Sequence, residues 1–156
     1  ANYKVDPPLR GREHVEALVE GLCDGTIDVI SSDHQPVAAE KKELEMDVAP
    51  FGIVGLETLL PLSVRALIES ERMDWPQLIG LLTTGPARVL DLDKGSLEVG
   101  ADADVVLIDP DAAWTIEPDK FRSRCSNSPF GGWQVTGRVQ AVFVCGELRF
   151  QRDESS

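Results

Sequence analysis

The stretch "DGTIDVISSDHQP", residues 24–36, contains the clearest fold signal of this 156-residue chain. After an Asp-Gly-Thr turn, residues 27–32 are rich in β-branched side chains and end in polar serines, which predicts a short strand. The segment before the turn, residues 10–22, carries apolar side chains at helical spacing: Val15, Leu18, Val19 and Leu22. That spacing predicts an amphipathic helix. A helix, a turn and a strand with a polar end are typical of α/β proteins.

Asp33 and His34 follow directly after the predicted strand. One interpretation is that Asp33 closes an Asx turn before Pro36, because aspartate is common in such turns. The other is that its carboxylate takes part in chemistry, because functional groups of α/β folds collect at the carboxyl ends of strands. The local sequence leaves both open, although the α/β context favours the second.

The middle of the chain has a polar loop followed by helical patterns. Residues 38–50, "AAEKKELEMDVAP", are polar and end in proline, which predicts a mobile loop. Residues 53–68 are apolar nearly all round, and this predicts a buried helix that Pro61 kinks or divides in two. The capping-box spacing that begins at Asp74 and the proline of "PARVLDL" predict two further helices.

After Lys94 the pattern changes from helices to strands. Residues 96–99 and 105–108 are predicted short strands, and "GRVQAVFVCGELRF" is a predicted β-hairpin that turns at Cys145 and Gly146. We therefore place a boundary near residue 93. The predicted organisation is an α/β part over 1–92, a small β part over 93–150 and a frayed tail over 151–156.

Composition argues against some classes of partner. The net charge of −12 would repel phosphate backbones and anionic lipid, so we expect neither nucleic acid nor a membrane as partner. The three cysteines are widely spaced without a Cys-x-x-Cys pair, which favours reduced thiols in a cytoplasmic protein. The chain opens without methionine on the extended segment "ANYKVDPPLR", and we expect it to be the C-terminal part of a longer polypeptide.

Several familiar catalytic motifs are absent from the sequence. It has no glycine-rich phosphate loop, no Gly-x-Ser-x-Gly elbow and no His-Glu-x-x-His pair. Its two histidines mean that a zinc site made from this chain alone would depend on carboxylates and thiols. If Asp33 is a metal ligand, most of its fellow ligands must come from residues outside this chain.

A series of motifs resembles the C-terminal part of class I dihydroorotases, in the cyclic-amidohydrolase branch of the amidohydrolase superfamily. In chain order they are "KVDPPLR", "DGTIDVISSDHQP", "APFGIVGLET", "PARVL", "KGSLEVGADADVVLID", "NSPFGGW" and "GRVQAVFVCGE". The resemblance runs from Lys4 to about Phe150. It implies that residues 1–92 close a metal-dependent (β/α)₈ TIM barrel. Residues 93–150 would then complete a small β-sandwich whose other strands come from the N-terminal portion of the polypeptide.

The resemblance also implies a reaction. Class I dihydroorotases interconvert dihydroorotate and carbamoyl-aspartate in pyrimidine biosynthesis, using one or two zinc ions that activate the attacking water. Asp33 matches the aspartate at the end of the last barrel strand. It would be both a metal ligand and the catalytic group that takes a proton from water and returns it to the ring nitrogen. His34 matches a family histidine, and a structural and a site-supporting role are both open for it.

Four other positions match substrate-binding positions of the family. Phe51 and Gly52 match a loop pair that meets the substrate, although Phe51 is equally compatible with a core plug. Asp6 stands where the family usually has an asparagine that bonds the pyrimidine ring, and an ionised aspartate cannot donate. Val37 stands where the family has a histidine that helps hold the substrate carboxylate.

These departures leave three functions open. The first is dihydroorotase itself, and the second is a related cyclic amidohydrolase that resembles hydantoinases or allantoinases. The third is a catalytically silent dihydroorotase-like subunit that partners aspartate transcarbamoylase. The presence of Asp33 favours an enzyme that acts on a small-molecule substrate. The expected protein partners are the N-terminal portion of the same polypeptide and either a second copy or aspartate transcarbamoylase.

Overall fold

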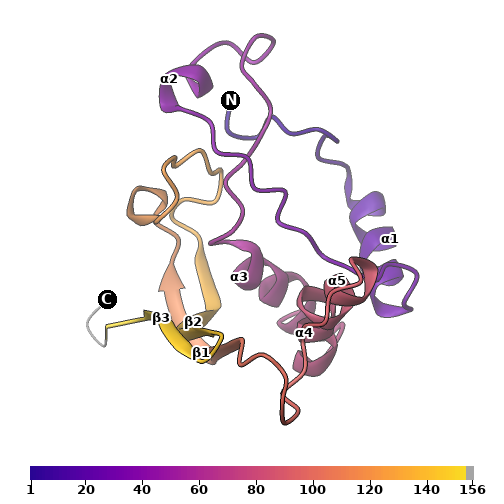
Figure 1. Cartoon of the computed structure of the whole chain (residues 1–156). Helices are drawn as coiled ribbons and strands as arrows, with labels where there is room; N and C mark the ends of the chain where they lie inside the picture. Colours follow the sequence, from indigo (N-terminus) through magenta and orange to yellow (C-terminus); the bar gives the residue numbers. More distant parts are fainter. Residues whose placement is uncertain (154–156) are drawn as a thin grey trace.

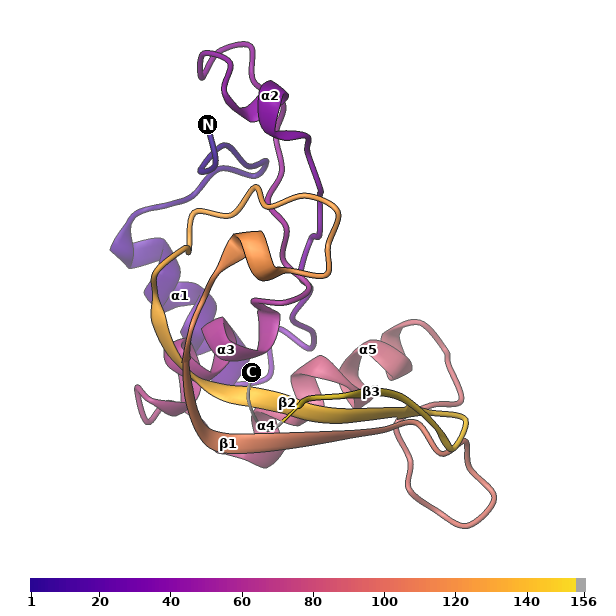
Figure 2. The same cartoon turned by 90° about the vertical axis from the view of Figure 1, so that its left-hand side faces the viewer.

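The computed structural model describes residues 1–153 (Figure 1). Helices α1 (Arg12–Cys23), α3 (Leu59–Ser63), α4 (Trp75–Leu82) and α5 (Thr84–Val89) gather beside a three-stranded sheet. The N-terminal segment and the loop that carries α2 (Ala39–Lys42) extend away from this body in both views (Figures 1 and 2). Within the described part of the chain, no helix has both the length and the apolar character needed to cross a membrane.

The helix predicted over residues 10–22 is confirmed as α1. Its Val19 and Leu22 pack against the core cluster of Val64, Leu67 and Leu78. Val15 and Leu18, on the same apolar pattern, remain 49% and 57% exposed. The described residues therefore cover only part of the apolar face of α1.

The strand predicted over residues 27–32 is wrong as a regular strand. These residues are not part of any ladder, and Ile30 N–H instead donates to Leu81 O at 3.1 Å. Among residues 1–153 the adjoining segment makes a single parallel bridge, between His34 and Ile53. A strand needs hydrogen-bonded neighbours along its length, so the β-branched run alone does not produce one here.

The buried helix predicted over residues 53–68 begins later than expected. Residues 53–58 form the bridge and a turn, α3 begins at Leu59, and η1 (Val64–Ile68) continues it as a π-helical turn. Pro61 occupies the first turn of α3, where backbone N–H groups have no helical partner in any case. The proline therefore fits the start of this helix and does not kink its middle.

The remaining helical predictions are confirmed. Asp74 caps α4 in a capping box, in which it exchanges two 2.9 Å hydrogen bonds with Gln77. Helix α5 begins at Thr84, two residues before the proline of "PARVLDL".

The sheet consists of β1 (Val105–Thr115), β2 (Gln134–Val144) and β3 (Glu147–Gln151), antiparallel in the order β1-β2-β3. The predicted hairpin is confirmed, with Cys145 and Gly146 at φ values of 51° and 77° in its turn. Positive φ at both positions is typical of a two-residue hairpin with a type I′ turn. Strand β1 is longer than predicted and its register with β2 shifts between Asp109 and Ala113. A short 3₁₀ turn, η2 (Pro118–Lys120), follows β1.

Two other predictions for the C-terminal part differ from the structure. No strand forms at residues 96–99. Gln151, placed in the frayed tail, belongs to β3, and the rest of the predicted tail beyond residue 153 lies outside the described residues.

The sheet approaches the helices at Gly137 of β2. A Cβ atom at this position would lie 3.2 Å from Val64 Cγ2 and 3.5 Å from the Trp75 ring, and φ is 85°. Only glycine therefore satisfies both the backbone conformation and the close packing on η1 and α4.

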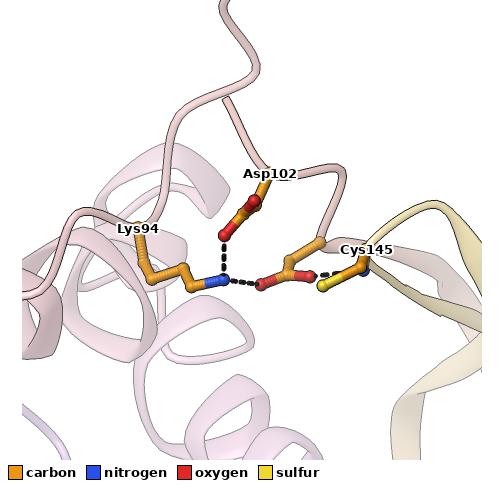
Figure 3. A network of polar contacts seen from close by, with 4 residues as sticks. Lys94, Asp102 and Cys145 are labelled. Atoms are coloured by element: carbon orange, nitrogen blue, oxygen red, sulfur yellow. Dashed lines mark hydrogen bonds and ion pairs between the residues drawn. The ribbon is translucent and has the colours of Figure 1, made fainter. Parts of the chain in front are cut away.

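Ionic contacts fix the connection between α5 and the sheet (Figure 3). The Lys94 ammonium donates to the carboxylates of Asp102 and Asp104, and Asp104 also accepts the Cys145 N–H at 2.8 Å. These bonds from Lys94 and Cys145 lower the pKa of Asp104, and the two carboxylates raise the pKa of Lys94. The network ties the β2–β3 turn to the segment that leaves the helices.

Candidate functional site

Asp33 lies exposed at the end of the extended segment that follows α1. Its φ of 42° is in the left-handed region, and its Oδ1 accepts a 2.8 Å hydrogen bond from Gln35 Nε2. The Gln35 N–H donates to Ile53 O at 2.9 Å and not to the Asp33 carboxylate. The Asx turn that the local sequence allowed is therefore not formed. The Asp33 carboxylate is instead oriented by the Gln35 side chain and stays exposed to solvent.

His34 has a structural role in this arrangement. Its Nδ1 accepts from the backbone N–H groups of Gly55 at 3.1 Å and Leu56 at 3.3 Å. His34 thus fastens the end of the extended segment to the turn that precedes α3.

Phe51 and Gly52 lie beside the Asp33 segment. A Cβ on Gly52 would stand 2.6 Å from Gln35 Cβ, and the residue has a φ of 121°. Phe51 is 49% exposed, with the Lys4 ammonium 4.7 Å from its ring centroid. Among the described residues Phe51 is therefore not packed into a core, and both a substrate-facing role and packing against the rest of the protein stay open for it.

In the cyclic amidohydrolase that the sequence motifs resemble, we predict that Gly52→Ala lowers kcat/KM by at least about tenfold, because the new methyl group must displace Gln35, which holds Asp33. Gly11→Ala is the matched control, since a Cβ there meets nothing within 4 Å. Steady-state kinetics of both purified variants make the comparison. Equal kinetics in the two variants would contradict the close contact.

Asp6 and Val37, the two positions that depart from the family pattern, flank this region. Asp6 is exposed, two residues after Lys4, whose carbonyl accepts the Gly52 N–H at 2.9 Å. Val37 is half-buried, and its N–H donates to Asn127 Oδ1 at 3.0 Å. Hydrogen bonds thus join the segments around Asp6 and Gly52 to the segment that carries Asp33 and Val37.

Asn127, which sequence reasoning did not single out, joins these segments. It is 4% exposed, and its Nδ2 donates to Gln35 O at 3.0 Å and Gly52 O at 3.1 Å. The motif "NSPFGGW" contains it, but nothing in the local pattern indicates its contacts. They lie 75 to 92 positions earlier in the chain.

The loop over residues 38–50, predicted to be mobile, is anchored by Lys42. This residue is 5% exposed, and its ammonium donates to Pro50 O at 2.9 Å and Ala1 O at 3.3 Å. Burial, and then the nearby Lys4 charge, lowers the pKa of Lys42. The anchor holds the loop end that leads into Phe51.

The described chain does not complete a metal site. Over residues 1–153 there is no group of three or more His, Cys, Asp or Glu side chains that could hold a metal ion. The Asp33 carboxylate is a chemically suitable zinc ligand, but a site that uses it needs ligands from elsewhere.

A model of the amidohydrolase family matches residues 5–149. The chain belongs to this family. The match includes Asp33, the Phe51–Gly52 pair, Asn127 and nearly all of the sheet. It confirms the family resemblance that the sequence motifs carried.

The chain is similar to proteins named dihydroorotase. It is 47% identical to that of Geobacter sp. (strain M21) over 150 residues, which are 96% of the chain and 35% of the relative. It is 47% identical to that of Geobacillus sp. (strain WCH70) over 152 residues, which are 97% of the chain and 36% of the relative. The chain thus spans about a third of the length of these curated relatives.

Solved structures of hydantoinases share the fold of the chain. The L-hydantoinase of Arthrobacter aurescens has a TM-score of 0.90 at 34% identity, over 99% of this chain and 36% of that one. The D-hydantoinase of Thermus sp. has a TM-score of 0.87 at 29% identity, over 96% of this chain and 34% of that one.

Proposed function

We propose that this chain is the C-terminal portion of a cytoplasmic dihydroorotase, which hydrolyses the cyclic amide of dihydroorotate reversibly to carbamoyl-aspartate in pyrimidine biosynthesis. The observation that carries the proposal is the exposed Asp33 carboxylate, which accepts a hydrogen bond from Gln35, the residue that also lies against Gly52. Relatives named dihydroorotase at 44–47% identity support this substrate over other cyclic amides.

Asp33 acts in this proposal as the group that moves the proton. Water adds to the ring amide carbonyl while the Asp33 carboxylate accepts one of its protons. The bond between the carbonyl carbon and the ring nitrogen then breaks, and Asp33 returns the proton to the nitrogen. In this proposal the backbone at Gly52 meets the substrate ring, since glycine has no side chain to stand between them.

The rest of the machinery is proposed to lie in the N-terminal portion of the polypeptide. Residues 1–92 would close a (β/α)₈ barrel, and residues 93–150 would join further strands in a β-sandwich. Zinc, held by Asp33 together with ligands from that portion, would lower the pKa of the attacking water. The relatives are roughly three times as long as the chain, which supports the proposal that other parts of the site lie outside it.

A related cyclic amidohydrolase is the second candidate. Solved structures of hydantoinases match the fold, and Asp6 and Val37 replace two side chains that the family uses for dihydroorotate. A silent subunit of aspartate transcarbamoylase is the third. The deciding experiment compares hydrolysis of dihydroorotate, a hydantoin and allantoin by the zinc-loaded full-length protein. Preference for dihydroorotate supports the proposal, preference for another ring supports the second candidate, and no turnover supports the third.

We predict that Val37→His in the full-length enzyme lowers KM for dihydroorotate by about tenfold or more. A donating imidazole would add a charge-assisted contact with the substrate carboxylate, worth roughly 1.5–3 kcal/mol. Val37→Leu is the control for side-chain size. A raised KM, with a hydantoin still turned over well, would show that the natural substrate lacks this carboxylate.

A further inference from the structure

We propose that Asn127, which belongs to the C-terminal β part, is a positioning residue that sets the geometry of the Asp33 and Gly52 segments. The inference deepens the proposed function and rests on it for its kinetic test. In this proposal Asn127, the first residue of "NSPFGGW", supports catalysis without contacting the substrate.

Both polar atoms of the Asn127 side chain form hydrogen bonds, and their partners lie on two separate segments of the chain. Its amide nitrogen donates to Gln35 O at 3.0 Å and Gly52 O at 3.1 Å, and its amide oxygen accepts the Val37 N–H at 3.0 Å. Its backbone carbonyl accepts the Val54 N–H at 3.1 Å. With 4% exposure, these bonds are shielded from water, so each group would be costly to leave without a partner.

We call the three side-chain hydrogen bonds of Asn127 the clamp, and this clamp is connected to Asp33 through Gln35. Asn127 fixes the Gln35 carbonyl, and the Gln35 side chain donates to Asp33 Oδ1 at 2.8 Å. The same Gln35 side chain would collide with any Cβ at position 52. A shift of Gln35 therefore moves the proton-transfer carboxylate and the substrate-facing glycine together.

A second contact holds the clamping segment itself in place. The Glu57 carboxylate accepts the N–H groups of Arg122 and Ser123, each at 3.0 Å, and the Ser123 hydroxyl at 2.8 Å. Figures 1 and 2 show the loop after η2 running beside the segment that leads into α3. Glu57 thus holds the segment that carries Asn127, and Asn127 in turn holds the backbone at Gln35 and Gly52.

The test uses Asn127→Ala and the isosteric Asn127→Asp in the zinc-loaded full-length enzyme. Asn127→Asp keeps the acceptor for Val37 but replaces the amide donor that serves two carbonyls. We expect kcat to fall about tenfold or more in both variants, because displaced catalytic groups lose alignment. Zinc content should stay at the wild-type level.

Leu78→Ala supplies the control for lost stability. Leu78 is fully buried in the helical core, and its truncation should lower Tm without a fall in kcat at 25 °C. Ser126→Ala, at an exposed neighbour of Asn127, should behave as wild type. Wild-type kcat and KM in Asn127 variants that are folded at the assay temperature would overturn the proposal. So would an equal loss of kcat in Leu78→Ala.

Gln35→Met keeps the test decisive if the Asn127 variants do not fold. It removes only the side-chain donor to Asp33, and kcat should fall while KM changes less; unchanged kcat would overturn the proposal. If the wild type hydrolyses no cyclic amide, the proposed function fails instead. Amide hydrogen exchange at Val37 then decides the clamp, since Asn127→Ala should speed that exchange and Leu78→Ala should not.

Discussion

Replacing Asp33 with alanine in the full-length enzyme is expected to keep the fold and to lower turnover by at least about 100-fold, the scale of a lost positioned proton transfer. The substitution leaves the backbone contacts of the segment in place, because they run through Gln35 and His34. Within residues 1–153, the Asp33 carboxylate accepts a hydrogen bond from Gln35 Nε2. Its removal should therefore act mainly on chemistry, with a small loss of stability because alanine is less favourable than aspartate at a φ of 42°.

Asp28→Ala provides the matched control for this prediction. Asp28 is an exposed carboxylate on the same extended segment, five positions before Asp33. Its loss should leave kcat within about twofold of wild type. Measurements of kcat, KM and Tm on the two variants separate a catalytic carboxylate from a merely nearby one. Near-normal turnover by a well-folded Asp33→Ala enzyme would remove Asp33 from the mechanism.

Elements whose signals are local were predictable from the sequence. The capping box at Asp74, the hairpin turn at Cys145 and the amphipathic helix α1 depend on residues within a few positions of one another. The strand at residues 27–32 was not, because a parallel strand depends on neighbours that local pattern does not supply. The late start of α3 has a related cause, since residues 53–58 bond to the His34 and Asn127 segments before a helix begins.

The candidate site divides in the same way. Asp33, Phe51 and Gly52 belong to family motifs, so the sequence proposes them as site residues, and their roles stay predictions. Asn127 was not found from sequence, because its role consists of bonds to backbone groups far away in the chain. An asparagine that is buried in order to bond backbone carbonyls produces no periodic pattern and no motif spacing in the sequence.

The isolated chain should neither retain stoichiometric zinc nor hydrolyse dihydroorotate, because residues 1–153 contain no cluster of metal ligands around Asp33. The described surface also contains apolar side chains and sheet edges that are not covered. Leu18, Val89 and Leu90 are 57%, 64% and 65% exposed, and the outer edges of β1 and β3 have no strand partner among the described residues. Such apolar patches and open edges favour association of the separate chain.

Mixing the chain with a separately produced N-terminal portion should restore zinc binding and dihydroorotate hydrolysis together. Both properties need Asp33 on one polypeptide and the remaining ligands on the other, so neither should return without the other. A mixture made with the Asp33→Ala chain is the control: it should assemble through the same apolar surfaces but show at least about 100-fold less turnover. Zinc content, sedimentation and hydrolysis of each sample give the answer. Tight zinc binding with turnover by the chain alone would show that the site is not shared between the two portions.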